Sequence, residues 1–387
     1  MHNNGRVSVQ IRGGVRHIAT MRGAFWLGAA HLVVDAVCVT SVYRACPLAD
    51  SALASALAFV LGYDLLAFAG QAPLGWLIDR WSLRRGAALT GLVLTAAALL
   101  AGRNAGIVVM VLAGVGNALF HLGAGAMVLA GSRERAAPAG VFVAPGALGL
   151  GLGIILGRKF LSVPLWPFLF AIAAACVAVL LVSARSEEAP AEPVSEPARG
   201  HGAVLLILTL LSLSVAVRSL VGTVGCDTCS RGLFLMVALP ITGFTGKLVG
   251  GFLADRFGWI DLAMVALLSS TPLLAFSGGD LWLALPGLMI FQMTMPVTLA
   301  ATLRALPAWP ALGFGILCLA LVAGTLPAYL PGGWRPQGIA LLFLVLGSAA
   351  VLHLALRLLQ RRSRLRTAPS IGSNQRGTSS ALCGGHP

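Results

Sequence analysis

The stretch Gly75-Trp76-Leu77-Ile78-Asp79-Arg80-Trp81-Ser82-Leu83-Arg84-Arg85 lies between two long apolar runs and decides the fold. A second copy, Gly251-Phe252-Leu253-Ala254-Asp255-Arg256-Phe257-Gly258, follows 176 residues later. Glycine, an aromatic residue, leucine, an apolar residue, aspartate, arginine and a second aromatic residue come in the same order in both copies. A repeat of this length, with each copy set between two hydrophobic segments, predicts a protein of two related halves.

The composition places the chain in a membrane. Hydrophobic residues make up 58% of it and charged residues only 10%, whereas about a quarter of the residues of a soluble globular protein are charged. Backbone polar groups in lipid must be satisfied within helices or a closed barrel, and apolar runs of about 20 residues favour helices. The net charge of +14 comes from arginines between the apolar runs. It therefore indicates topology signals facing anionic lipid, and we expect no nucleic-acid partner.

Twelve apolar segments follow one another, six on each side of an acidic, proline-rich stretch. They cover about 22–44, 51–73, 86–101, 105–130, 137–157, 163–184, 203–224, 231–253, 260–277, 281–303, 311–330 and 337–359. We therefore predict an all-α membrane protein with twelve transmembrane helices in two pseudo-symmetric halves, residues 22–184 and 203–359. Residues 1–21 are expected to form an N-terminal tail without a signal-peptide cleavage site, 185–202 an extended linker and 360–387 a disordered tail.

Lysine and arginine are distributed unevenly over the predicted loops. If the N-terminus is inside, 19 of the 27 face the cytoplasm and six face the outside, with Arg218 and Lys247 inside segments. Cytoplasmic loops of membrane proteins carry an excess of positive charge. The sequence therefore predicts cytoplasmic N- and C-termini and a cytoplasmic linker, in the inner membrane of a bacterium.

The first stretch resembles a conserved loop of the major facilitator superfamily, which joins helices two and three of each half. It matches through Gly75, Asp79, Arg80, Arg84 and Arg85. The second copy keeps Gly251, Asp255 and Arg256 but has Ile260 and Asp261 in place of the trailing arginines. The resemblance covers about residues 22–359 and implies a secondary transporter in which these loop residues gate the transport path. We expect Asp79 to cap a helix end or to pair across the interface between the halves, with Arg80 and Arg84 at the cytoplasmic surface.

Ionisable and polar side chains lie inside several segments, where a charge costs about 2.5–3.5 kcal/mol or more and needs a reason. In the first segment His31 and Asp35 are four residues apart and share a helix face, as do Asn117 and His121 in the fourth. Other segments contain Asp64, Arg218, Lys247 and Gln292. The alternative interpretation, open above all for Asn117, Gln292, Asp64 and Lys247, is that these groups only hold the bundle together.

The histidine and the carboxylate of the first segment suit proton chemistry. Histidine changes charge near neutral pH, and a neighbouring carboxylate tunes that change, as a proton-coupled carrier requires. Arg218 keeps its proton and needs an anionic partner, which is either Asp35 or an acid group of the substrate.

These residues narrow the resemblance further. The pair His31-x-x-x-Asp35, the run Gly116-Asn117-x-x-Phe120-His121 and Arg218 resemble the fosmidomycin-resistance branch of the superfamily, although Leu122 replaces the proline that usually follows the histidine. The run from Val143 to Gly151 is similar to the helix-bending motif of exporters, in which Pro145, Gly146 and Gly149 would permit a bend. In the superfamily, helices one, four, seven and ten line the central cavity. The resemblance therefore implies one chamber surrounded by His31, Asp35, Asn117, His121, Arg218 and Gln292.

The candidate site is absent from the second half of the repeat. Adding 176 to positions 31, 35, 117 and 121 leads to Ile207, Leu211, Met293 and Val297, which are all apolar. The scaffold and the loop are repeated and the site is not, so the proton chemistry is predicted for the N-terminal half.

No motif for catalysis accompanies these features. The sequence has no serine nucleophile with a nearby base, no His-Glu-x-x-His and no glycine-rich phosphate loop followed by lysine, so we do not expect an enzyme. We predict a proton-coupled exporter of a small drug or metabolite that works as a monomer in the bilayer, with no cofactor or metal. The alternatives are an importer of a small anion, recognised by Arg218 and His121, and a non-transporting sensor, which the short tails disfavour.

Among the cysteines only Cys226 and Cys229 are closely spaced. Two thiols and Asp227 do not make a four-ligand zinc site. A structural role, a disulfide on the outer side and a redox or metal-sensing role all remain open for this pair.

Overall fold

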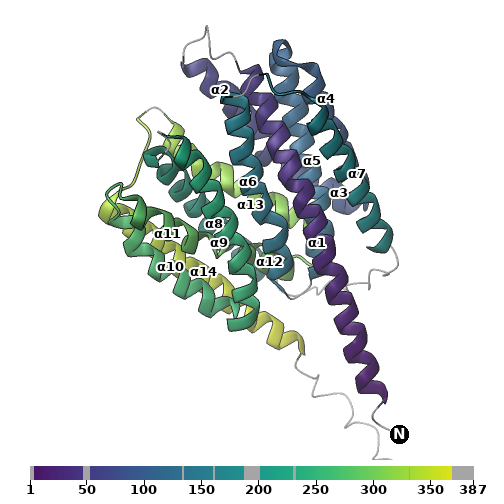
Figure 1. The fold of residues 1–387 in the computed structure, drawn as a ribbon. Helices are drawn as coiled ribbons and strands as arrows, with labels where there is room; N and C mark the ends of the chain where they lie inside the picture. The colour runs from purple at the N-terminus through teal and green to yellow at the C-terminus, as the bar shows by residue number, and fades with distance from the viewer. Residues whose placement is uncertain are drawn as a thin grey trace, which may run out of the picture.

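The computed structural model describes residues 4–46, 53–132, 135–159, 162–186, 201–229, 232–330 and 332–367, and these ranges are mainly helical (Figure 1). The helices of the N-terminal half are α1 (Asn4–Ala45), α2 (Leu53–Asp64), the π-helix η1 (Leu65–Ala69), α3 (Gln71–Arg80), α4 (Arg84–Ala101), the short 3-10 helix η2 (Arg103–Ala105), α5 (Gly106–Ser132), α6 (Ala137–Lys159) and α7 (Trp166–Ser186). Those of the C-terminal half are α8 (His201–Cys229), α9 (Leu233–Phe257), α10 (Trp259–Ala275), α11 (Leu281–Gln292), α12 (Met295–Ala305), α13 (Pro310–Tyr329) and α14 (Gly338–Thr367).

The twelve predicted segments are confirmed as helical. In the described part of the chain, ten helical spans are long and apolar enough to cross a membrane, and α10 is a shorter apolar helix. The remaining predicted segment, the second, is divided among α2, η1 and α3. The tenth segment is also divided, between α11 and α12, because Pro296 near the start of α12 has no N–H to continue the preceding helix.

Several helices run past the predicted ends of the apolar segments. The first begins at Asn4, inside the expected tail 1–21, and the last continues to Thr367, so the expected disordered tail is wrong for 360–367. A helix satisfies its own backbone hydrogen bonds and needs apolar side chains only where lipid surrounds it. Hydropathy therefore marks the membrane-embedded part rather than the whole helix. Of the expected linker, 187–200 lie outside the described residues, as do 368–387 of the tail.

The two halves pack against each other mainly along two pairs of helices. Across the interface, α6 packs on α9 and α3 packs on α13, while α1 packs on α6 within the N-terminal half. The N-terminal half (purple to blue-green) and the C-terminal half (green to yellow) lie side by side in Figure 1. The N-terminal part of helix α1 extends beyond the bundle at one end (Figure 1).

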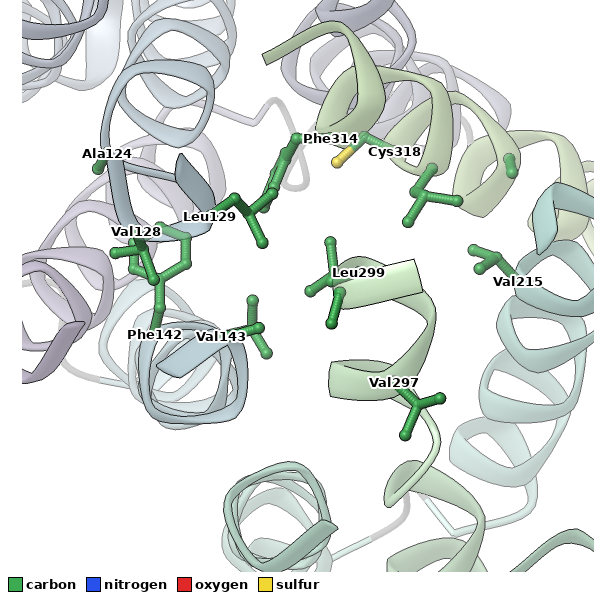
Figure 2. Close-up of a cluster of buried hydrophobic side chains, with 14 of the residues drawn as sticks. Ala124, Val128, Leu129, Phe142, Val143, Val215, Val297, Leu299, Phe314 and Cys318 are labelled. Atoms are coloured by element: carbon green, nitrogen blue, oxygen red, sulfur yellow. The ribbon is translucent and has the colours of Figure 1, made fainter. Parts of the chain in front are cut away.

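The buried core continues from one half into the other. Leu129, Phe142 and Val143 of the N-terminal half lie opposite Leu299 and Phe314 of the C-terminal half (Figure 2). The rings of Phe142 and Phe314 meet edge to face with centroids 6.3 Å apart, a favourable arrangement for aromatic pairs. This aromatic contact joins α6 to α13 next to the candidate site.

Candidate site in the membrane core

Helix α1 places His31 and Asp35 one turn apart on the same face. The distance from His31 Nε2 to Asp35 Oδ2 is 3.1 Å, and only 6% of the surface of His31 is exposed. The pair expected from the i,i+4 spacing therefore forms within a single helix.

Helix α5 brings Asn117 and His121 to the same point. The amide of Asn117 donates through Nδ2 to Asp35 Oδ1 at 2.9 Å. His121 Nε2 lies 3.6 Å from Asp35 Oδ1 and 2.7 Å from His31 Nε2. These four residues, His31, Asp35, Asn117 and His121, are called the proton cluster below.

The hydrogen bonds of the two imidazoles determine how many protons the cluster holds. His31 Nδ1 lies 2.9 Å from the carbonyl oxygen of Phe142, and His121 Nδ1 lies 2.8 Å from that of Asn117. Because a carbonyl oxygen only accepts, both Nδ1 atoms donate. A hydrogen bond between the two Nε2 atoms then requires a further proton on one of them, since two neutral rings would turn their lone pairs towards each other. The geometry therefore corresponds to one imidazolium shared by two rings and balanced by the Asp35 carboxylate.

The same three groups offer ligand atoms that could also surround a metal ion. Their atoms lie within 4.8 Å of one another. A tetrahedral ion bound at about 2.0–2.1 Å would hold two imidazole nitrogens about 3.4 Å apart. The observed 2.7 Å between the Nε2 atoms fits a shared proton and is too short for that arrangement.

Glycines of α6 let this helix close against the proton cluster. A Cβ atom at Gly146 would meet His31 Nε2 and Asp35 Oδ2, and one at Gly149 would lie 3.0 Å from Asp35 Cβ and against the Leu32 carbonyl. Helix α6 continues through Pro145 without interruption. In this conformation Gly146 and Gly149 serve close helix contact, and the bend expected from Pro145, Gly146 and Gly149 stays a prediction.

Gly149→Ala is expected to destabilise the protein, because the added methyl would press on the backbone of α1 and overpacking costs about 1–3 kcal/mol. Gly347→Ala in α14 is the matched control, since a Cβ there meets nothing within 4 Å and alanine favours a helix. The apparent melting temperature of the purified protein in detergent should fall for the first variant and not for the second. Equal melting temperatures would contradict the close α1–α6 contact.

Arg218 and Gln292 do not join the proton cluster. Arg218 Nη1 and Nη2 donate to Thr294 Oγ1 at 3.3 Å and to Thr298 Oγ1 at 3.2 Å. Gln292 ends α11, and its Cβ faces Gly246 of α9. Asp35, one of the two partners considered for Arg218, is occupied by the imidazoles and by Asn117.

Lys247 and Asp64, the other ionisable residues expected inside the segments, lie on α9 and at the end of α2. Lys247 on α9 is half-buried, and its ammonium group is attracted by Asp35 and repelled by Arg218. Asp64 ends α2 where the π-helical turn begins, a type of irregularity found often at functional sites. Cys226 and Cys229 end α8, and their side chains lie outside the described part of the structure.

The repeated loop carboxylates join the two halves at one end of the bundle, called the motif end below. Asp79 Oδ2 accepts from the N–H of Leu312 in the first turn of α13 at 2.9 Å. Asp255 Oδ1 and Oδ2 accept from the N–H groups of Ala136 and Ala137 at the start of α6, at 2.7 and 3.1 Å. Each half thus places its motif carboxylate on a helix N-terminus of the other half, where the helix dipole favours negative charge.

The other loop residues surround these contacts. Gly75 and Gly251 allow the approach, because a Cβ at either would meet the backbone of the opposite half. Arg84 Nη2 lies 3.3 Å from Asp79 Oδ1, and the Arg256 guanidinium lies 5.7 Å from the ring centroid of Phe257. Arg80 and Arg85 are exposed.

Comparison with solved structures assigns the architecture. No family model matches the sequence, and no match is found among curated proteins. The fucose:proton symporter of E. coli superposes with a TM-score of 0.61 at 15% identity, over 88% of this chain and 98% of the symporter. Another structure of that protein, described as a major facilitator superfamily transporter in the outward conformation, gives 0.62 at 14% over the same shares. The chain has the major facilitator fold.

A bacterial homologue of the iron transporter ferroportin, in its outward-facing state, gives a TM-score of 0.52 at 15% identity, over 88% of this chain and 99% of that one. The proteins in these structures are described as a proton symporter and as a homologue of an iron transporter. Their identities are low, so the likeness concerns the fold, and the interpretation of the site depends on the geometry described above.

Three features of the site were not found from the sequence. Thr294 and Thr298 bind Arg218, and their spacing of one helical turn within an apolar segment was a usable signal. The backbone carbonyl of Phe142 sets the His31 tautomer, and no sequence pattern marks a backbone acceptor. The contact of Phe314 with the ring of His121, with centroids 6.3 Å apart, depends on the packing of the two halves.

Proposed function

We propose that the protein is a proton-coupled secondary transporter that exports a small organic molecule across the bacterial inner membrane by alternating access. The observation that carries this proposal is the 2.7 Å separation of His31 Nε2 and His121 Nε2, which is consistent with one shared proton in a buried cluster beside the interface of the halves. The motif residues His31, Asp35, Asn117, His121 and Arg218 further favour the fosmidomycin-resistance branch within the superfamily.

Proton release would change the packing around the cluster. Without the shared proton, the two Nε2 lone pairs repel each other and favour separation of α1 from α5. His31 is also bonded to the Phe142 carbonyl on α6, and the Phe142 ring contacts Phe314 on α13 of the other half. In the proposed mechanism, these contacts would connect the protonation state to the interface along which the halves rock.

Hydrogen bonds at the motif end connect the two halves. The hydrogen bonds of Asp79 and Asp255 hold the halves together there, so they stabilise a state in which that end is shut. With cytoplasmic termini, as the loop charges favour, this state would be open or opening towards the outside. We propose this orientation, and a monomer as the working unit.

Direction and coupling are tested together in membrane vesicles. A screen of cells with and without the gene for altered toxicity or metabolite levels supplies the substrate. We expect inverted vesicles whose interior is acidified to accumulate that substrate, and a protonophore to abolish the accumulation. Accumulation that survives collapse of the pH gradient would rule out proton coupling.

Import of a small anion is the second candidate, favoured by the absence of a carboxylate partner for Arg218 among the described residues. In that case right-side-out vesicles with an acidic exterior would accumulate the substrate and inverted ones would not. Binding without flux in either orientation would favour a sensor.

A further inference from the structure

We propose that the substrate is an organic anion whose carboxylate or phosphate-type group binds to Arg218, with Lys247 as a second positive charge, at the break between α11 and α12. This deepens the proposed transport function and rests on it. It also assigns different tasks to the halves, with the proton on the N-terminal half and the anion on the C-terminal half.

Arg218 is a buried cation without a charged partner in the described structure. It is 3% exposed. Its guanidinium donates to two neutral hydroxyls, those of Thr294 and Thr298, and its Nε has no hydrogen-bond partner among the described residues. Leaving a buried charge unpaired costs several kcal/mol, and a charged group in a transmembrane helix normally faces a partner or a substrate path. A ligand that carries the missing negative charge would satisfy both conditions.

Asp35, the other possible partner of Arg218, does not supply that negative charge. Asp35 contacts His31, His121 and Asn117, and the proton shared by the imidazoles balances its charge. Lys247 of α9 adds a second cation, which Asp35 attracts and Arg218 repels, and no hydrogen bond or ion pair of its side chain occurs within the described ranges. The region around Arg218 therefore has an excess of positive charge.

The local backbone also suits an anion. Thr294 is the N-cap residue of α12, and Pro296 lies in the first turn. The N-terminus of a helix carries partial positive charge, and broken helices in transporters place such ends at anionic substrate groups near the middle of the membrane. Arg218 is anchored to this end through Thr294 and Thr298.

The chemistry of the guanidinium narrows the ligand class. Arginine binds planar carboxylates and phosphate-type groups through two parallel N–H···O bonds, and the unpartnered Nε leaves one such edge incomplete. Lysine acts as a point charge without that geometry. Binding of a singly charged carboxylate would therefore depend mainly on Arg218. Binding of a doubly charged phosphate ester would depend on both Arg218 and Lys247.

The test measures ligand-induced stabilisation of the purified full-length protein in detergent, without any gradient. The probes share one ring and differ in charge: benzoate, phenyl phosphate, neutral benzamide and cationic benzylammonium, each at millimolar concentration. We expect the two anions to raise the apparent melting temperature and the other two to leave it unchanged. Failure of both anions, or equal stabilisation by benzamide, would overturn the proposal.

Variants of Arg218 and Lys247 test whether these residues bind the anions. Arg218→Gln should weaken anion binding by about tenfold or more, as expected for loss of a charge-assisted hydrogen bond worth about 1.5–3 kcal/mol, and Arg218→Lys should weaken it less. Lys247→Gln should affect phenyl phosphate more than benzoate. Arg158→Gln, at an exposed position, is the matched control and should bind like the unmodified protein. Anion binding that persists in Arg218→Gln would overturn the proposal.

A structural role for Arg218 predicts a different result. If its hydrogen bonds to Thr294 and Thr298 mainly hold the helices together, Arg218→Gln lowers the ligand-free melting temperature. If its charge waits for a ligand, removal of the unpaired charge leaves that temperature unchanged or raises it. A lipid source of the acid group is distinguished by nanodiscs, because stabilisation by phosphatidate but by neither soluble anion would assign the site to a headgroup and overturn the substrate proposal.

Anion binding at Arg218 can be tested separately from proton coupling. Asp35→Asn should keep anion binding, because Asp35 is not part of the anion site. If Arg218→Gln abolishes binding while Asp35→Asn still accumulates substrate on a pH gradient, the anion site stands and the assignment of the proton cluster fails. If anions bind to neither the unmodified protein nor Asp35→Asn while gradient-driven transport persists, the anion site fails and the transport function stands.

Discussion

Asp35→Asn is expected to abolish accumulation of substrate driven by a pH gradient. In the proposed mechanism the carboxylate balances a proton shared by His31 and His121, and its Oδ2 lies 3.1 Å from His31 Nε2. Asparagine removes this charge with little change in volume. Removing one partner of a buried ion pair costs about 3–5 kcal/mol, so the imidazoles should no longer hold the proton. The accumulation ratio in vesicles should then fall to the level without the transporter.

Exchange of substrate for substrate should survive in Asp35→Asn, because it needs no net proton movement. Asp261→Asn is the matched control: this acid lies exposed in the first turn of α10 and should leave both activities unchanged. If Asp35→Asn still accumulates substrate after a pH jump, Asp35 is not the coupling site, and His121 is the next residue to replace.

Asp79→Asn and Asp255→Asn should each shift the protein away from the state in which the motif end is shut. A hydrogen bond to a charged group contributes about 1.5–3 kcal/mol, which corresponds to a shift of about tenfold to a hundredfold in the equilibrium between states. Asp255 accepts from the N–H groups of Ala136 and Ala137, and Asp79 interacts with those of Leu312 and Ala311 in the opposite half. We therefore expect a shift from each single variant and the largest shift from the double variant.

Spin labels at Gly86→Cys and Phe257→Cys report the separation of the halves at the motif end, since both positions are exposed and lie on different halves. The distance distribution should gain a longer component in each variant, and the transport rate should fall while membrane insertion stays intact. A control with Asp261→Asn should keep the original distribution. An unchanged distribution together with unchanged turnover would refute the gating role of these carboxylates.

The two copies of the repeat differ in the side chains that they bury. Ile207, Leu211 and Val297, which correspond to His31, Asp35 and His121 after the 176-residue offset, are all buried apolar residues of the core. The motif carboxylates, in contrast, make equivalent contacts in both halves. The duplicated scaffold thus keeps its interface contacts in both copies, whereas the equivalent positions of the second half do not repeat the polar residues of the cluster.

Local patterns in the sequence were sufficient for the helices and for part of the site. Hydropathy gave the twelve segments because a membrane-embedded helix must present apolar side chains over about 20 residues. The spacing of His31 and Asp35, and of Asn117 and His121, fixed which residues share a helix face. The helix ends were predicted less well, since a helix outside the lipid no longer needs apolar residues.

What only the tertiary structure decided is which helix faces meet. The sequence by itself determined two related sets of membrane helices, the motif at their ends and the polar residues within them. It did not reveal that α5 brings His121 to within 2.7 Å of His31, that Gly146 and Gly149 admit α6 to the cluster, or that Arg218 binds Thr294 and Thr298 instead of Asp35. The physical reason is that helices in lipid gain little from burying apolar surface and associate through close packing and interhelical hydrogen bonds, which depend on shapes contributed by distant parts of the chain.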